Sequence, residues 1–544
     1  MEKKRTNGGR TMENGRSLSH VCEIRNGELI RYYGDDTEFT VPDDVTTIAY
    51  DAFRNCRRLT EVTLGKRVTS IHSGAFAKCR NLRRVTFPSS LREIGDEVFE
   101  GCSALIAVLL PRAVYTIGEH AFRGCENLKK AVLPAELKSL GQGAFSGCES
   151  LEELVLPEGL SAIHSNTFFR CRALRSLQIP IGLQTVGSFA FAQCTALEDL
   201  NLPDGVTYLG RGAFSECGSL TSFKVPASTK FLGNYAFSCC ESLEQIEIPE
   251  TVTVIGNYTF CACKSLQEIV LPTELESIGQ GAFLGCSKLQ KISLPSGVSS
   301  IGKQAFAFCT ELASVELNDG LTTLEDGTFT GCRTLETIRL PDTMITVGES
   351  VFQGCASLRS VYLPRGLQTI ESRAFDGCAL KNISFPYRML QIGDRAFANG
   401  RELETVIMPE AKTRIGAGVF AGCQALSVLV IPEGILFPMR KKKRWKVPET
   451  AQIIYRSELE LSQMFAEWSS DDVTPERREK LRQEIDERIK TLKKRNRLHS
   501  VEPIRENLHK VAQAVEEQTL AAKDSPVGTE TASEPNEEVP DLND

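Results

Sequence analysis

The chain has 544 residues, of which 41% are hydrophobic and 24% are charged, and its net charge is -7. Seven acids and no base lie in residues 524–544, so the rest of the chain is neutral overall. That balance gives no global electrostatic reason to expect a nucleic acid or an anionic membrane as a partner. The longest strongly apolar stretch, Ala104 to Leu110, is far too short to cross a bilayer.

The N-terminal segment, residues 1–18, is polar and is expected to be disordered. It lacks the apolar region of a secretion signal, so we expect a cytoplasmic location, with the cell surface or secretion as the alternative. Residues 19–42 follow as a predicted N-terminal β-hairpin cap, because Val21 to Tyr33 alternates around Asn26-Gly27, a strong signal for a two-residue hairpin turn.

A repeat of 23 residues occupies residues 43–438 and is counted 17 times. Phenylalanine recurs at this interval from Phe53 to Phe375, and the series continues with Phe397 and Phe420 after a one-residue deletion. Cysteine follows three residues after the phenylalanine in 16 repeats, with Gly400 as the exception, and leucine follows three residues later in all 17. Such a series predicts stacked coils that bury one another's apolar faces.

Each column of the repeat has a structural interpretation. Leu151 to Leu156 alternates with the period of a strand, and Leu160 to Ile163 can form a second short strand. Glycine then occurs in 12 repeats, as expected for a turn with positive φ. The Ala144-Phe145 and Cys148 columns suit a short helix or 3₁₀ turn. We therefore expect a leucine-rich-repeat solenoid with a parallel sheet roughly 80 Å long, short second strands and short helical turns, plus C-terminal helices.

The segment Leu289 to Cys309, LQKISLPSGVSSIGKQAFAFC, resembles the BspA-type leucine-rich repeat, whose motif is close to L-x-x-I-x-I-P-x-x-V-x-x-I-G-x-x-A-F-x-x-C. The resemblance extends from about Asp43 to Glu433, over 70% of the chain. It implies the solenoid fold. Members of that family are mostly surface proteins of anaerobic bacteria and parasitic protists, and several are adhesins or matrix-binding proteins. This sequence departs from them in lacking a secretion signal and an evident wall anchor.

Beyond the repeats, residues 439–470 are expected to form a basic loop and a C-terminal cap. Arg440 to Lys446 holds six bases in seven residues. We expect a solvated loop there, and the alternative is a nuclear-targeting or nucleic-acid patch in which Trp445 stacks on bases. Ala451 to Tyr455 resembles a closing strand. A capping box at Ser457 then opens a helix through Trp468.

Residues 471–523 are predicted to form a helical hairpin beside the array. Its first helix opens at Thr474-Pro475 and runs to about Arg497, and its second spans about Pro503 to Ala522. The alternative is a short coiled coil or partner-binding element. The acidic tail, residues 524–544, is expected to be disordered.

The cysteines and histidines do not form a catalytic, cofactor-binding or metal-binding pattern. Sixteen of the 19 cysteines occupy one column of the repeat, as expected for small buried hydrophobic residues with free thiols. Cys239 and Cys261 lie outside that column. The six histidines are scattered, and no Ser/His/Asp or Cys/His constellation can be placed. An enzyme with its site in the C-terminal helices is therefore the least supported class, and no cofactor or small-molecule substrate is expected.

The outward column of the strands offers the best candidate site. Leu109, Val132 and Val155 are apolar in three successive repeats. Further apolar positions in this column are Val270, Tyr362, Ile407 and Val430. Leu109, Val132, Val155 and Tyr362 are predicted to bind a partner, because an exposed apolar run amid polar neighbours indicates a contact patch. Two explanations without a binding role are that strand propensity alone selects these apolar residues, or that inserted side chains or a neighbouring loop cover them.

This pattern predicts a non-enzymatic protein-binding scaffold, with a BspA-like surface adhesin that binds host or matrix proteins as the alternative. The expected partner is a protein, whereas a nucleic acid is not expected and no membrane span is predicted.

Overall fold

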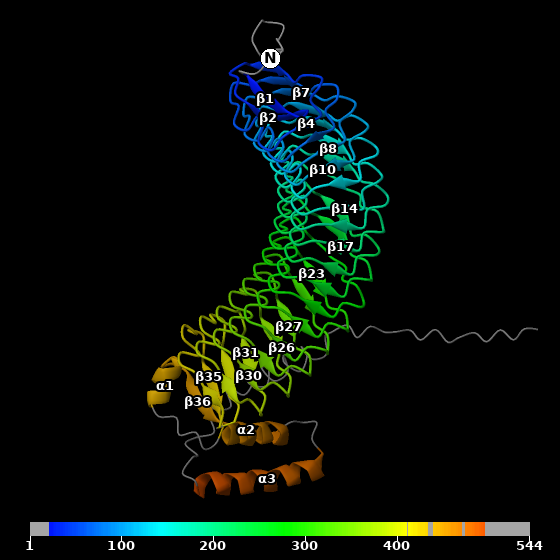
Figure 1. Ribbon diagram of the computed structural model, residues 1–544. Coiled ribbons are helices and arrows are strands. Elements are labelled where there is room, and N and C mark those ends of the chain that lie inside the picture. Colours follow the sequence, from blue (N-terminus) through cyan, green and yellow to red (C-terminus); the bar gives the residue numbers. More distant parts are fainter. Residues whose placement is uncertain (1–20, 411, 433–438, 470–473, 495–544) are drawn as a thin grey trace, which may run out of the picture.

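The computed structural model describes residues 21–410, 412–432, 439–469 and 474–494. The repeats stack into one elongated, curved superhelix, and three helices gather at its C-terminal end (Figure 1). The solenoid predicted from the 23-residue period is therefore confirmed. Residues 1–18, the predicted helix over Pro503 to Ala522 and the acidic tail lie outside the described residues.

The N-terminal hairpin consists of β1 (Cys22–Arg25) and β2 (Glu28–Tyr32), which pair antiparallel. Its turn residues Asn26 and Gly27 have φ values of 50° and 79°, the positive values that a type I′ turn requires. Strand β2 then pairs in parallel with the first short strand of the array, so the hairpin covers the open edge of that sheet.

Each coil contributes up to two strands. Those of the longer column are β3 (Glu38–Thr40), β5 (Glu61–Thr63), β7 (Arg84–Thr86), β9 (Ala107–Leu109), β11 (Lys130–Val132), β13 (Glu153–Val155), β15 (Ser176–Gln178), β18 (Ser222–Lys224), β20 (Gln245–Glu247), β23 (Lys291–Ser293), β25 (Ser314–Glu316), β27 (Thr337–Arg339), β29 (Ser360–Tyr362), β31 (Asn382–Ser384), β33 (Thr405–Ile407) and β35 (Val428–Ile431).

The two-residue strands of the shorter column are β4 (Thr47–Ile48), β6 (Ser70–Ile71), β8 (Glu93–Ile94), β10 (Thr116–Ile117), β12 (Ser139–Leu140), β14 (Ala162–Ile163), β16 (Thr185–Val186), β17 (Tyr208–Leu209), β19 (Phe231–Leu232), β21 (Val254–Ile255), β22 (Ser277–Ile278), β24 (Ser300–Ile301), β26 (Thr323–Leu324), β28 (Thr346–Val347), β30 (Thr369–Ile370), β32 (Gln391–Ile392) and β34 (Arg414–Ile415).

Neither column forms one uninterrupted sheet. The longer strands divide into separate sheets such as β3-β5-β7, β15-β13-β11-β9 and β31-β33-β35-β36. Residues 199–201 and 268–270, at the equivalent place in their repeats, are not strands. The expected continuous sheet of roughly 80 Å is thus replaced by shorter sheets on a continuous stack of coils.

The core lies between the two strand columns and contains one phenylalanine per coil. Neighbouring rings stack nearly parallel: the centroids of Phe191 and Phe214 are 5.4 Å apart with an interplanar angle of 4°, and Phe283 and Phe306 are 5.2 Å apart at 3°. These side chains are completely buried. Each ring therefore contacts the coil before it and the coil after it, which is why a single repeat cannot stabilise its own core.

The segment around each phenylalanine is a chain of turns and not the short helix or 3₁₀ turn that we predicted. Around Phe53, the amide of Ala52 donates to the Ala49 carbonyl, and the amide of Cys56 donates to the Phe53 carbonyl. Asp51 and Asn55, the third residues of these two turns, have φ values of 54° and 61°. This is the geometry of type II turns, and residues with positive φ at this spacing prevent a continuous helix.

The glycine column has a different cause from the one predicted. The glycines four residues before each phenylalanine do not have positive φ, whereas the column two residues before it does, as at Gly143 with 59°. A Cβ built on Gly141 would lie 2.4 Å from the carbonyl carbon of Gly118 in the preceding coil. Glycine is therefore favoured here because the backbones of successive coils approach too closely for a side chain.

The cysteine column is a ladder of buried thiols that donate hydrogen bonds. The Sγ of Cys148 donates to the Phe122 carbonyl at 3.2 Å, and that of Cys171 donates to Phe145 at 3.2 Å. Fifteen ladder thiols make this contact, from Cys79 to Cys423. All 19 cysteines are free. A thiol thus fills the space of a small hydrophobe and also supplies a donor to a buried carbonyl.

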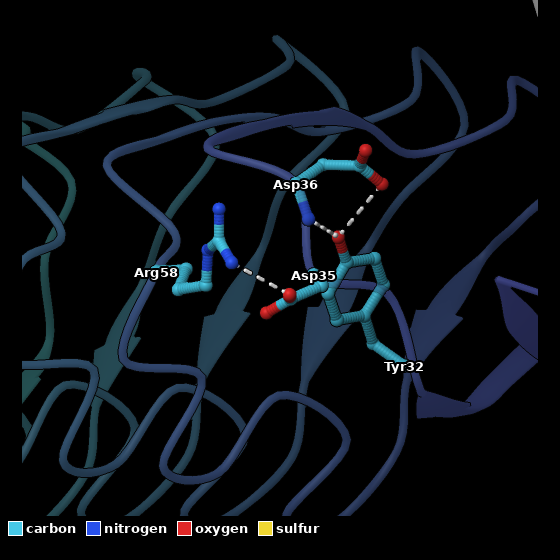
Figure 2. Close-up of polar contacts among 4 residues, drawn as sticks. All are labelled: Tyr32, Asp35, Asp36 and Arg58. Carbon is cyan, nitrogen blue, oxygen red and sulfur yellow. Dashed lines mark hydrogen bonds and ion pairs between the residues drawn. The ribbon is translucent and has the colours of Figure 1, made fainter.

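Tyr32 ends the phenylalanine column at the N-terminus. Its ring stacks on Phe53 with centroids 5.1 Å apart, where a preceding coil would have placed a phenylalanine. Figure 2 shows that its hydroxyl points to Asp36, whose amide donates to the Tyr32 oxygen at 3.3 Å and whose carboxylate accepts from it at 3.3 Å. Beside it, Arg58 donates to the carboxylate of Asp35 at 2.8 Å. A tyrosine can serve here because its ring packs in the core while Asp36 provides hydrogen-bond partners for its hydroxyl.

The basic segment at the C-terminal end of the array is the helix α1 (Met439–Trp445), so the prediction of a loop is wrong. The amide of Gly418 donates to the Arg444 carbonyl and that of Phe420 to the Trp445 carbonyl, at 2.7 and 3.0 Å. These bonds replace the ones that a further coil would have supplied. Trp445 is 4% exposed and therefore packs in the core, where it is not available to stack on a nucleic acid.

The chain then closes the longer-strand column with β36 (Gln452–Tyr455), which pairs in parallel with β35. Helix α2 (Arg456–Ser469) packs across this end of the sheet, and α3 (Pro475–Lys494) packs against α2 (Figure 1). Leu461 and Ile485 form the buried contact between the two helices. None of the helices in the described parts of the chain is long and apolar enough to cross a membrane.

Candidate interaction surface

The outward face of the longer strands carries the candidate patch. On the sheet β15-β13-β11-β9, Leu109, Val132 and Val155 are 61, 43 and 58% exposed. The residue Ile106, which precedes β9, is 49% exposed and lies in the same repeat as Leu109. We call Ile106, Leu109, Val132 and Val155 the apolar patch.

The strand register brings the members of the apolar patch together. Leu109 is the direct partner of Val132 in the parallel pairing of β9 and β11. Strands β11 and β13 are paired at Lys130 and Glu153, two residues before Val132 and Val155. Neighbouring strands are about 4.8 Å apart, so the side chains form a contiguous ridge across three coils. Lys130 and Glu153 are exposed and form a charged border.

Tyr362, the fourth predicted residue, does not join the apolar patch, because it lies nine repeats beyond Val155 on the separate sheet β27-β29. Its ring lies under the guanidinium of Arg339, 4.6 Å from the ring centroid, and its hydroxyl donates to Asp342 at 3.0 Å. Burial and this hydrogen bond raise the pKa of Tyr362. The side chain is thus half-buried and held by its own neighbours.

The outward column is covered at the C-terminal end. Ile407 and Val430 are 6% and 0% exposed, and they form a buried cluster with Val428, Ile454 and Leu459 of α2. Ile407 and Val430 occupy the same outward column of the repeat as Leu109. A helix that follows the array packs on them. The apolar patch differs in that no described residue covers it.

A column of aromatic side chains that was not predicted from the sequence lies on the turn segments. Arg211 lies between the rings of Phe189 and Tyr235, 6.0 and 5.1 Å from their centroids, and Tyr235 stacks on Tyr258 at 5.0 Å. The three aromatic residues occupy the positive-φ column two residues before the core phenylalanine. The spacing of these aromatic residues in multiples of 23 could have revealed them in the sequence. The glycines that occupy this column in other repeats indicate only a turn.

A hollow of about 540 Å³ lies beside this column, over the short strands β21, β22 and β24. Its polar lining includes Asn234 and Asn257. The Oδ1 of Asn234 accepts from the amide of Asn257, and that of Asn257 accepts from the amide of Gln280, at 2.8 and 2.7 Å. These carboxamides tie successive coils together. No cluster of three or more His, Cys, Asp or Glu residues suited to a metal ion occurs within the described ranges.

Comparison with known proteins decides the family. A family model described as BspA type Leucine rich repeat region (6 copies) matches residues 32–145, 116–243, 230–359 and 322–437. The chain belongs to the BspA-type leucine-rich repeat family. The resemblance stated from the repeat motif is therefore confirmed, and a search of curated proteins gave no match.

Solved structures similar to this BspA-type protein include a leucine-rich repeat protein from Bacteroides ovatus, with 27% identity over 79% of this chain and 94% of that chain and a TM-score of 0.44. A leucine-rich repeat protein of T. pallidum is 33% identical over 32% of this chain and 83% of its own, with a TM-score of 0.31. A leucine rich cell surface protein from Faecalibacterium prausnitzii is 20% identical over 83% and 99%, with a TM-score of 0.36.

Proposed function

We propose that this BspA-type protein is a non-enzymatic scaffold that binds a protein partner through the apolar patch on β9, β11 and β13. The proposal is supported by a difference in solvent exposure between apolar side chains of the same outward column. At the C-terminal end, Ile407 and Val430 are covered by the protein's own helix α2. At the apolar patch, Leu109 and Val155 are about as apolar but are more than half exposed. Exposed apolar ridges with charged borders are typical of contact surfaces.

The packing of α2 indicates what can bind there. Leu459 of α2 fits against the outward side chains of neighbouring strands, so this sheet face accepts an apolar side chain from a helix. We expect a partner that presents an apolar stripe, with acidic and basic groups opposite Lys130 and Glu153. A few buried contacts at the centre of such an interface supply most of the binding free energy.

The test uses Val132→Asp and Val155→Asp in the full chain, with Ser293→Asp as the matched control in the same column of a distant coil. Affinity capture from the native host, followed by mass spectrometry, should retain a defined partner with the wild type and the control, and lose it with both patch variants. Circular dichroism should be unchanged in all three, because these side chains point away from the core. Equal capture by the patch variants would refute the proposal.

The alternative function is a surface adhesin that binds host or matrix proteins, and family membership favours it. The two functions differ first in location. Intact native cells treated with a membrane-impermeant amine label should leave this protein unlabelled if it is cytoplasmic, and should label exposed lysines such as Lys130 if it is an adhesin. We propose the cytoplasmic scaffold as the leading interpretation, so strong labelling of intact cells would favour the adhesin.

A further inference from the structure

The C-terminal end of the array presents a fixed basic surface that the proposed partner site does not use. Helix α1 replaces the next coil, since the carbonyls of Arg444 and Trp445 accept backbone hydrogen bonds from the last repeat. The buried Trp445 anchors the helix in the core. In contrast, Arg440, Lys443 and Arg444 are exposed. The bases of α1 are therefore held on a rigid element rather than on a free loop.

A hollow of about 300 Å³ adjoins α1 and extends this surface. Arg444 of α1 and Arg414 of β34 line it from two different elements, together with Ser372 and Gln391. Its one lining carboxylate, Asp394, accepts a hydrogen bond from the amide of Ala417 at 2.6 Å. Two arginine residues that line one hollow, with a serine and a glutamine beside them, supply the side-chain chemistry that recognises carboxylates.

The bases of this surface are not paired within the described part of the chain. The ion pairs in the described part of the chain join other residues, such as Arg339 with Asp342 and Arg477 with Glu467. The Nζ of Lys442 donates to a backbone carbonyl, that of Glu449, at 3.0 Å. We define the basic surface as residues 440–446 together with Arg414. It concentrates seven bases at one end of a chain whose first 523 residues are neutral overall.

The chain itself contains a segment of opposite charge. Residues 524–544 hold seven acids and no base, which accounts for the whole net charge of -7. The described chain leaves at Lys494, at the end of the superhelix where α1 also lies (Figure 1). The 29 residues from 495 to 523 separate the two. Fully extended, 29 residues span at most roughly 100 Å, and the reach is still about 60 Å if the predicted helix over Pro503 to Ala522 forms, so the acidic segment can reach α1.

We propose that the basic surface receives the acidic segment 524–544 of the same chain. Each contact is solvent-exposed and individually weak. The covalent linker compensates for the weakness of the individual contacts, because it keeps the acidic segment near the basic surface at an effective concentration near the millimolar range. The contact masks the basic surface against other anions, and the chain exposes that surface when the segment is removed or displaced. This inference does not depend on the apolar patch or its partner.

The test is zero-length carbodiimide cross-linking of the full chain at low salt, which joins lysines to carboxylates that touch. We expect the acidic segment to cross-link to Lys441, Lys443 and Lys446. The double variant Lys441→Glu/Lys443→Glu removes two of these amines and should also lose the link to the unchanged Lys446, because its reversed charge repels the acidic segment. The matched control Lys480→Glu/Lys490→Glu changes the charge equally on exposed positions of α3 and should keep them. High salt should abolish the links, because exposed ion pairs are screened.

Two further measurements distinguish the acidic segment of the same chain from other occupants of the basic surface. Mixing equal amounts of nitrogen-15-labelled and unlabelled chain identifies links between two copies, and a mixed-isotope fraction that approaches the statistical limit of about one half would overturn a contact within one chain. A fluorescent poly-glutamate peptide should bind a chain that lacks residues 524–544 on the order of tenfold more tightly than the full chain. Equal affinity for both chains, or links spread evenly to Lys480 and Lys490, would overturn the proposal. Circular dichroism of each variant checks that the fold is intact.

Discussion

Raising the pH should weaken this solenoid through its buried thiols. Burial raises the pKa of ladder residues such as Cys148 and Cys194 far above the ordinary value of 9.0. Below that value the thiols are neutral in both the folded and the unfolded chain. Above it the unfolded chain loses protons that the folded chain keeps, so the free energy of unfolding falls as the pH rises.

The magnitude follows from the number of thiols that become exposed. One pH unit above the unfolded pKa, each buried thiol lowers the free energy of unfolding by about 1.4 kcal/mol. Four successive ladder thiols, Cys148, Cys171, Cys194 and Cys217, should together contribute about 6 kcal/mol near pH 10. Each is completely buried, so solvent screening does not reduce this effect. A solenoid can unfold in parts, so this figure applies to a unit that contains all four coils.

Replacing these four cysteines with serine isolates the effect. Serine retains a donor for the phenylalanine carbonyl but does not ionise in this range. Urea unfolding followed by circular dichroism, with a reductant present, gives the free energy of unfolding at pH 8 and pH 10. The fall between the two should be smaller in the quadruple variant by about 6 kcal/mol. Lysine and tyrosine titrate equally in both chains, so their effect cancels. Identical pH dependence in the two chains would refute the reasoning.

Three further predictions test the backbone packing, the N-terminal cap and the thiols outside the ladder. Gly141→Ala should destabilise the array by about 1–3 kcal/mol in urea unfolding, because its Cβ overlaps the preceding coil, whereas Gly218→Ala, with open space around its Cβ, should not. Tyr32→Phe should keep the ring stack but lose a hydroxyl hydrogen bond, with a cost of about 1 kcal/mol seen as faster hydrogen exchange in the first coils only; exchange that rises throughout the array would contradict a local role. A maleimide should label the half-buried thiols Cys239 and Cys261 of the native chain much faster than the ladder thiols, as read by peptide mapping, and uniform labelling would contradict a closed core.

The one-dimensional pattern determined the architecture of this protein. Apolar residues at a constant spacing of 23 can be buried only if identical coils stack, so the period alone led to the solenoid and to the BspA-type family. Asn26-Gly27 likewise predicted the hairpin at the N-terminus, since few other residue pairs accept positive φ at two successive positions. The outward direction of Leu109, Val132 and Val155 followed from the period of two in a strand.

Only the tertiary structure decided which outward residues stay exposed. Ile407 and Val430 have the same place in the repeat as Leu109, yet α2 covers them, because that later segment folds back onto the last strands. The Gly141 column and the burial of Trp445 depend in the same way on an adjacent backbone rather than on a local preference. Periodicity specifies how a side chain points within its own coil, but it does not encode what a distant segment places on top of it.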